Sequence, residues 1–214
     1  MADMNAFTPR LRTISFALLT ALACGLPAVS QEAASPSYNI ELVIFRATSA
    51  QGIPENWSAE AGSSNIVAGE EASSGSSQVG RFVSMIPNSS YQLTDIESKL
   101  RSSGAYVPVA HVAWSQTASG WGTRAGFTLQ KLGVDAPGLT GTVFLERGLY
   151  LHLGMSLSYA DPSPPQGLGA ASGTTFIMNQ SRRIRFYERN YYDHPAFGVI
   201  ALVSPSQGAR PPGR

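Results

Sequence analysis

Arginine or tyrosine occupies every second position from 183 to 191, near the C-terminal end of the chain. On a regular strand one face would carry three arginines and two tyrosines, namely Arg183, Arg185, Tyr187, Arg189 and Tyr191. Arginine offers a planar fork that matches carboxylates, and tyrosine offers a flat apolar ring with a hydroxyl. This face suits an anionic glycan or a peptide. A solvated strand face, with Ile184 and Phe186 packed on the other side, explains the pattern equally well.

The histidines are the next side chains that could support chemistry, and they stand at His111, His152 and His194. Together with Asp193 they could form a zinc site, but their spacing matches no known ligand pattern, so no metal or other cofactor is expected. His111 alternates with apolar residues, which is typical of a hydrogen-bonded histidine against a sheet.

Catalytic patterns are weak. The chain has no G-x-S-x-G nucleophile motif, and nothing pairs the strand-associated acids Glu41, Glu146, Glu188 and Asp193. Trp114 with Gln116 is a further candidate contact, although a core tryptophan is the favoured interpretation. A non-enzymatic protein is therefore expected. A hydrolase that uses His152 or His194 with a carboxylate is the alternative.

The charge balance argues against a general nucleic-acid binder. The chain has 214 residues, of which 15 are basic and 14 acidic, and charged residues make up only 14%. Without the first thirty residues, which hold Asp3, Arg10 and Arg12, the balance is 13 to 13. Binding to phosphate backbones requires an excess of basic charge. Serine, glycine and proline supply much of the polar remainder, so long loops are expected.

The N-terminal segment 1–30 resembles a secretory signal. Arg10 and Arg12 precede an apolar run that is too short for a comfortable membrane span, and Ala28-Val29-Ser30 offers small residues for cleavage. Cys24, the sole cysteine, follows Ala21-Leu22-Ala23 in a degenerate lipoprotein box. Ordinary cleavage is favoured over lipidation, and the folded part then contains no thiol and no disulfide.

Hydrophobic periodicity predicts the elements that must position these residues. Strands are expected over 38–46, 105–116 (with Pro108 favouring an edge or a bulge), 142–159 (with a bend near Arg147-Gly148), 176–192 and 197–203. Thr94 and Glu97 suggest a capping box for a helix over 95–103 that ends at Gly104. Residues 58–80 and 161–174 read as loops. The expected fold is α+β: a mainly antiparallel sheet of five to six strands with one short helix packed on it, in a single domain 31–204 followed by a disordered tail 205–214.

Several strings together resemble the CsiV family of peptidoglycan-binding proteins. Tyr38-Asn-Ile-Glu-Leu-Val-Ile-Phe45 is similar to the family's opening strand, and Glu55-Asn56-Trp57 follows it. Pro108-Val-Ala-His111-Val-Ala-Trp114-Ser-Gln116 and Leu149-Tyr150-Leu151-His152-Leu153 match two internal strings. The most specific match runs from Arg182-Arg183-Ile184-Arg185 through Glu188, Tyr191 and Asp193-His194-Pro195 to Phe197-Gly198-Val199-Ile200.

The resemblance implies a periplasmic, non-enzymatic protein that binds peptidoglycan and supports cell-wall synthesis and cell shape, through an outer-membrane lipoprotein that activates a class A penicillin-binding protein. An outer-membrane lipoprotein attached through Cys24 is the alternative location. By position, Arg183, Arg185, Tyr191 and His194 are the candidate ligand contacts, and Glu188 and Asp193 the residues that orient them. A simple turn also accounts for Asp193 and Pro195.

Two departures from the family pattern bear on binding. Leu149 replaces the usual arginine, and Arg189-Asn190 replace Leu-His before Tyr191. A protein scaffold whose Arg/Tyr face contacts another protein instead of a glycan is the third interpretation, because aromatic residues and arginine also favour interfaces.

Overall fold

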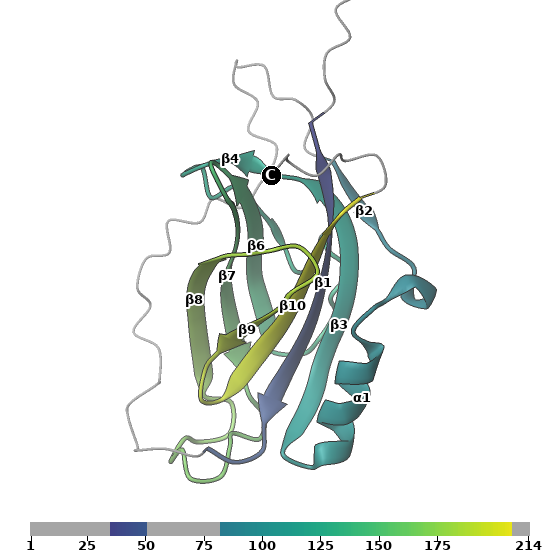
Figure 1. Cartoon of the computed structure of the whole chain (residues 1–214). Coiled ribbons are helices and arrows are strands. Elements are labelled where there is room, and N and C mark those ends of the chain that lie inside the picture. Colours follow the sequence, from purple (N-terminus) through teal and green to yellow (C-terminus); the bar gives the residue numbers. More distant parts are fainter. Residues whose placement is uncertain (1–34, 51–81, 207–214) are drawn as a thin grey trace, which may run out of the picture. The chain divides into compact units, whose positions relative to one another are not determined.

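Residues 35–50 and 82–206 are described by a computed structural model, and they form two β-sheets that pack face to face (Figure 1). The expected single sheet of five to six strands is therefore wrong, because the described residues form ten strands in two sheets. The mainly antiparallel pairing and the one short α-helix are confirmed. The predicted signal, Cys24, the loop 58–80 and the chain beyond residue 206 lie outside the described residues.

The first sheet has the strand order β2-β3-β1-β10-β9, and every neighbouring pair is antiparallel. Its members are β2 (Val83–Met85), β3 (Tyr106–Thr117), β1 (Ser37–Ala47), β10 (Phe197–Pro205) and β9 (Arg189–Asp193). The register between β1 and β3 shifts at Ile44/Phe45, opposite Pro108, so the bulge favoured by proline is present. β10 is an interior strand and includes Pro205, the first residue of the predicted tail.

The second sheet has the order β4-β6-β7-β8, with β5 also paired to β6. Its members are β4 (Ser119–Gly120), β5 (Gly126–Thr128), β6 (Leu139–Arg147), β7 (Leu151–Ala160) and β8 (Thr175–Arg183). The predicted strand 142–159 is thus a hairpin of β6 and β7, and the bend expected near Arg147-Gly148 is confirmed. The second sheet lies opposite the first in Figure 1.

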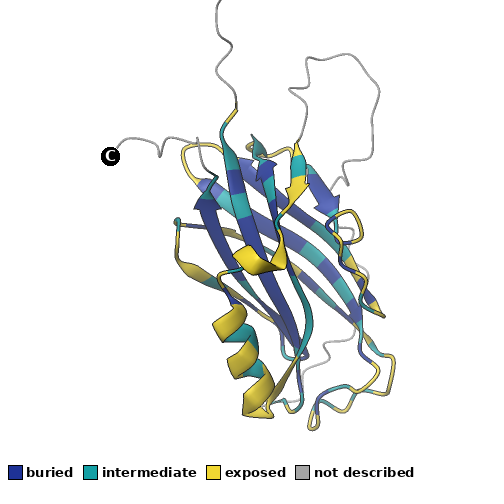
Figure 2. Cartoon of the chain, turned by 90° about the vertical axis from the view of Figure 1, so that its right-hand side faces the viewer, coloured by how far each residue is buried: buried dark blue, intermediate teal, exposed yellow. Residues whose placement is uncertain are grey.

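The core lies between the two sheets. Alternate residues of β1 and β7 point into it: Tyr38, Ile40, Leu42 and Ile44 from β1, and Leu151, Leu153, Met155, Leu157 and Tyr159 from β7. Figure 2 shows the buried positions along the strands. Tyr192 of β9 is buried and its hydroxyl donates to the Leu153 carbonyl at 2.9 Å, which joins the two sheets. Trp114 is fully buried and donates to Gln116 Oε1 at 2.7 Å, as expected for a core tryptophan.

Helix α1 (Thr94–Ser103), preceded by the 3₁₀ turn η1 (Asn88–Ser90), packs on the outer face of the first sheet. Ile96 and Leu100 contact a small buried cluster of Val43, Leu93 and Leu202. Gly104 ends the helix in the left-handed conformation, with φ 69°, which confirms the predicted C-terminal boundary. Most of the outward surface of α1 is exposed (Figure 2).

The predicted capping box is wrong. The residue before the helix is Leu93, and no side chain of the helix caps its first turn. A strand residue performs this role instead: the Glu41 carboxylate of β1 accepts from the Leu93 N–H at 2.7 Å and from the Gln92 N–H at 2.8 Å. The Glu97 carboxylate is bound elsewhere, to His111 at 2.7 Å. Tertiary contacts therefore replace the local cap.

Gly154 of β7 provides the space that the Phe144 ring occupies on the neighbouring strand. A methyl group at Gly154 would lie 2.0 Å from Phe144 Cζ. Gly154→Ala is therefore expected to lower the free energy of unfolding by about 1–3 kcal/mol, as overpacking does. Urea unfolding measures the loss. Gly120→Ala is the matched control, because its nearest neighbour would be Thr123 Cγ2 at 3.9 Å, and equal losses in the two variants would contradict the packing argument.

Candidate functional site

The predicted strand 176–192 is wrong, and with it the single Arg/Tyr face. β8 ends at Arg183, and the chain crosses to the other sheet before β9 begins at Arg189. Two backbone hydrogen bonds hold the crossing: Ile184 N–H donates to the Leu151 carbonyl, and Tyr187 N–H donates to the Val203 carbonyl. Arg183 and Tyr191 therefore belong to different sheets. Ile184 and Phe186 pack against the core, as expected.

Three of the six candidate contacts remain together at the far end of β9. Tyr191, Asp193 and His194 line two adjoining hollows on the outer face of the first sheet and its edge. Arg185 and Glu188 lie on the crossing turn, exposed and 3.6 Å apart from each other. Arg183 lies at the end of β8 beside Tyr150.

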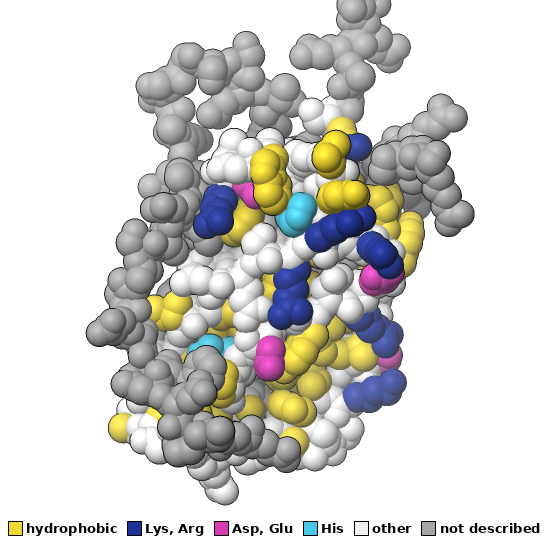
Figure 3. Space-filling view, turned by 60° about the vertical axis from the view of Figure 1, so that its left-hand side comes forward, with side chains coloured by type: hydrophobic (Ala, Val, Ile, Leu, Met, Phe, Trp, Pro, Cys, Tyr) yellow, Lys and Arg dark blue, Asp and Glu magenta, His cyan; other side chains and the backbone are white. Residues whose placement is uncertain are grey.

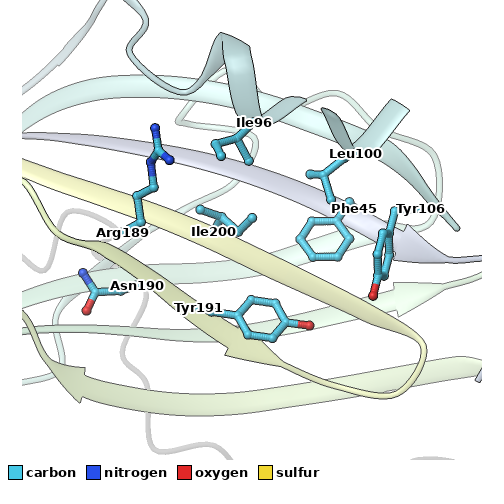
Figure 4. Close-up of a pocket in the computed structure, with 8 residues that line it drawn as sticks. All are labelled: Phe45, Ile96, Leu100, Tyr106, Arg189, Asn190, Tyr191 and Ile200. Carbon is cyan, nitrogen blue, oxygen red and sulfur yellow. The ribbon is translucent and has the colours of Figure 1, made fainter. Parts of the chain in front are cut away.

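The first hollow is a mainly apolar groove between α1 and β9, with a volume of about 360 Å³, which we call the tyrosine groove (Figure 4). It is lined by Phe45, Ile96, Leu100, Tyr106, Arg189, Asn190, Tyr191 and Ile200. The groove exists because α1 covers β1 and β3 but leaves the outer face of β9 open. Its volume falls within the range of small-ligand sites.

Aromatic contacts set the positions of the two groove tyrosines. The Tyr191 ring stacks on Phe45 with centroids 6.2 Å apart and planes 8° apart, and Tyr106 meets Phe45 edge-on at 5.2 Å. Gly198 of β10 permits this arrangement, because a methyl group there would lie 2.7 Å from Phe45 and 3.0 Å from Tyr191. Both tyrosines keep about two fifths of their surface exposed. The groove thus offers flat apolar faces to a ligand.

The second hollow is more polar, has a volume of about 330 Å³ and shares Tyr106 and Tyr191 with the groove. Asp193 supplies its carboxylate, whose Oδ1 accepts from the Tyr191 hydroxyl at 2.8 Å. Burial and this hydrogen bond raise the pKa of Tyr191, so its hydroxyl remains a donor to Asp193. A carboxylate has several acceptor positions, so Asp193 can hold Tyr191 and still accept a hydrogen bond from a ligand.

Arg189 closes the opposite end of the groove. Its guanidinium donates to the Asp95 carboxylate of α1 at 3.2 Å, and both side chains are about half exposed. This contact joins β9 to the helix across the mouth of the groove. Arg189 therefore lines the candidate site together with its neighbour Asn190.

His194 is buried and neutral at the turn between β9 and β10. Its Nδ1 accepts from the Ala196 N–H at 3.1 Å, and its ring packs against Phe176 and Phe197. Burial lowers the pKa of His194 to about 4. His194 also lines the polar hollow, and its bond to the Ala196 N–H shapes the turn.

The three histidines do not come together. His111 lies between the carboxylates of Glu41 and Glu97, at 2.8 and 2.7 Å, beneath α1. This confirms the expectation of a hydrogen-bonded histidine against a sheet. His152 packs on Trp121 at the other end of the fold. Within 35–50 and 82–206, no group of three or more His, Cys, Asp or Glu side chains is placed to hold a metal ion.

Sequence reasoning missed the partners of Tyr191. The sequence predicts Phe45 only as a strand residue, and no pattern in it predicts Tyr106, Ile96 or Leu100 as lining of a site. The alternation in β1 placed Phe45 on the face opposite Ile44, which was the available signal. The position of α1 relative to β9 has no local signal.

Of three comparisons with known proteins, one gives a match. No curated protein and no solved structure matches the chain. No helix of the described segments is long and apolar enough to cross a membrane. Residues 14–206 match the family described as "Peptidoglycan-binding protein, CsiV", and this match spans both sheets, α1 and the tyrosine groove. The chain therefore belongs to the CsiV family.

Proposed function

We propose that this protein binds peptidoglycan without cleaving it, and that the tyrosine groove with its polar hollow is the contact site. The observation that carries the proposal is the pair of half-exposed tyrosines at a concave site whose residues lie in the segments that match the family. Aromatic rings stack on the apolar faces of sugars, and a carboxylate accepts hydrogen bonds from sugar hydroxyls or amides.

The proposed contacts are Tyr106, Tyr191 and Asp193, with His194 supporting the turn that presents Asp193. Arg189, partly exposed at the mouth of the groove, is suited to a carboxylate of the peptide stem. Arg185 and Glu188 pair with each other outside both hollows and are not included. The occupied hydrogen-bonding positions of His111 and the burial of His194 support the non-catalytic part of the proposal.

The resemblance supports a wider role, which we include in the proposal. In this proposed role the protein lies in the periplasm. There it supports cell-wall synthesis and cell shape by contacting an outer-membrane lipoprotein that activates a class A penicillin-binding protein. Attachment to the outer membrane through Cys24 is the alternative location. Co-purification of the lipoprotein with the tagged protein from envelope extracts tests the partner independently of the glycan site.

Sedimentation with insoluble peptidoglycan sacculi at two salt concentrations tests the glycan site. We expect retention that falls at high salt, since the Arg189 contribution is screened. Tyr191→Ala is expected to weaken retention about tenfold, the equivalent of about 1.4 kcal/mol, because the stacking face is lost. Tyr187→Ala is the matched control, because Tyr187 is exposed on the crossing turn outside both hollows.

The soluble fraction of the same experiment separates the alternatives. Release of muropeptides would favour a wall hydrolase. Absence of both retention and release would favour a scaffold that contacts proteins alone. Equal retention of Tyr191→Ala and wild type would remove the groove from the proposal while leaving peptidoglycan binding in place.

A further inference from the structure

A second cluster of exposed aromatic and basic side chains lies at the end of the fold opposite the groove. We propose that this cluster, formed by Trp121, Tyr150, His152 and Arg183, is a separate binding surface for an acidic muropeptide, whose sugar ring stacks on the aromatic side chains while a free carboxylate of its peptide pairs with Arg183. The inference rests on the proposed function in so far as peptidoglycan is the source of that muropeptide. Figure 3 shows hydrophobic and basic side chains gathered around a histidine near the top of this face.

The cluster is open to solvent yet internally packed. Trp121 is 61% exposed and Tyr150 49%. The guanidinium of Arg183 lies over the Tyr150 ring, with Cζ 3.3 Å from the centroid, and the Trp121 ring leans on His152 with centroids 4.4 Å apart. These contacts fix the Trp121 ring on one side and leave most of its surface free. Such a flat apolar surface is what a sugar ring stacks on.

The backbone beneath the cluster holds it in place. Gly148, in the β6–β7 turn, lies directly under Trp121, because a methyl group there would be 3.3 Å from the Trp121 Cβ. The Glu146 carboxylate accepts from the Arg124 N–H, which ties the Trp121 loop to β6. Arg147 donates to the Tyr38 hydroxyl at 2.7 Å. A surface that is ordered before binding loses little conformational entropy when a ligand arrives.

The charge of the cluster selects an acidic ligand. Glu146, His152 and Arg183 are paired neighbours in a row across β6, β7 and β8. Glu146 is 3% exposed and already bonded, whereas Arg183 is exposed. The exposed charge of this row is therefore positive, and its guanidinium suits a free carboxylate on the peptide of a muropeptide. His152 Nδ1 is buried and has no hydrogen-bond partner among the described residues, which marks the cluster as distinct from an ordinary packed surface.

The distance between the two sites makes them independent contacts. Tyr38 of β1 touches Arg147 next to the cluster, and Phe45 of the same strand lines the groove. Seven residues of extended chain separate them by about 23 Å. One sugar ring cannot reach both sites, but the polymeric glycan network of a sacculus can. Two contacts on one network raise its retention above the affinity of either contact alone.

Titration with a purified disaccharide-tetrapeptide muropeptide tests the cluster directly. The indole N–H signal of Trp121, assigned as the signal missing from Trp121→Phe, is expected to shift on titration. The shift should persist in Tyr191→Ala. In sacculus sedimentation, Trp121→Ala and Arg183→Ala are each expected to weaken retention about tenfold. Phe82→Ala is the matched control, since Phe82 is a similarly exposed aromatic residue that lines neither site.

The outcomes distinguish this inference from the proposed function. Retention that is lost in Tyr191→Ala but unchanged in Trp121→Ala, with an unmoved Trp121 signal, would overturn the second surface and leave the groove intact. The reverse pattern would support the second surface and overturn the groove. A third measurement tests membrane contact. The 34–214 fragment, which holds the whole described fold, is sedimented with phosphatidylethanolamine/phosphatidylglycerol vesicles. Vesicle binding lost in Trp121→Ala, without a muropeptide shift, would show a membrane contact through Trp121 and the 97% exposed Leu149 instead.

Discussion

Glu41→Ala is expected to lower the free energy of unfolding by about 3–5 kcal/mol, because it removes one of the two carboxylates that hold the buried His111 and the acceptor of two backbone N–H groups. The side chains of Glu41 and His111 are only 7% and 9% exposed, and their atoms Oε1 and Nε2 lie 2.8 Å apart. The same carboxylate accepts from the N–H groups of Gln92 and Leu93, so the variant also loses the cap of α1. Urea unfolding followed by circular dichroism measures the effect.

The control is the exposed pair Lys99–Asp95 on the same helix, 3.7 Å apart. Lys99→Ala should change stability by less than about 1 kcal/mol, as surface pairs do. A double-mutant cycle between Glu41→Ala and His111→Ala then isolates the coupling, and strict additivity of the two losses would contradict a direct interaction.

The coupling between Glu41 and His111 has a defined pH window. Burial opposes ionisation of both groups, but their mutual hydrogen bond and those from Gln92, Leu93 and Glu97 outweigh it. The pKa of Glu41 is therefore below its ordinary 4.5, and the pKa of His111 is above its ordinary 6.5. The stabilisation is complete between these ordinary values. It is lost as the pH falls through the lowered pKa of Glu41, or rises through the raised pKa of His111.

The elements that could be predicted from sequence are those with a local cause. Alternation of apolar residues revealed β1 and the β6–β7 hairpin, because each strand buries one face against the opposite sheet. Gly104 marked the end of α1, because a left-handed residue there favours glycine. The predicted capping box of Thr94 and Glu97 is wrong because Glu41, more than fifty residues earlier, accepts from the Leu93 N–H instead.

The site was less predictable, because its geometry depends on where the chain changes sheet. Ile184 is buried and Phe186 stacks on Tyr38, so the apolar alternation of a strand continues through the turn. The long-range bonds from Ile184 to Leu151 and from Tyr187 to Val203 break the strand, and neither has a local signature. Tyr187 adopts φ 63°, a left-handed conformation that tyrosine rarely takes. The arginines and tyrosines of the pattern therefore do not share one face, because the chain changes sheet between Arg183 and Arg189.

Stability is expected to fall by about 3 kcal/mol between pH 7 and pH 4 through His194 alone. Burial against Phe176 and Phe197 lowers its pKa to about 4, although the neighbouring Asp193 opposes this shift. In the unfolded chain the same imidazole titrates near 6.5. Between these values the unfolded state binds a proton that the folded state does not, so the free energy of unfolding decreases as the pH falls.

Comparison of wild type with His194→Asn isolates this contribution. Asparagine places an acceptor near the position of Nδ1, so the hydrogen bond from the Ala196 N–H is retained while the titration is removed. The stability advantage of wild type at pH 7 should therefore shrink by about 3 kcal/mol at pH 4. His111→Asn should show the opposite trend, because the raised pKa of His111 makes its contribution largest at acidic pH, above the range where Glu41 and Glu97 become protonated. Parallel pH profiles for wild type and His194→Asn would show that His194 accepts its proton within the folded state. In mildly acidic conditions the protonated His194 would then place a positive charge beside Asp193 in the polar hollow. The hollow would favour an anion over a sugar hydroxyl.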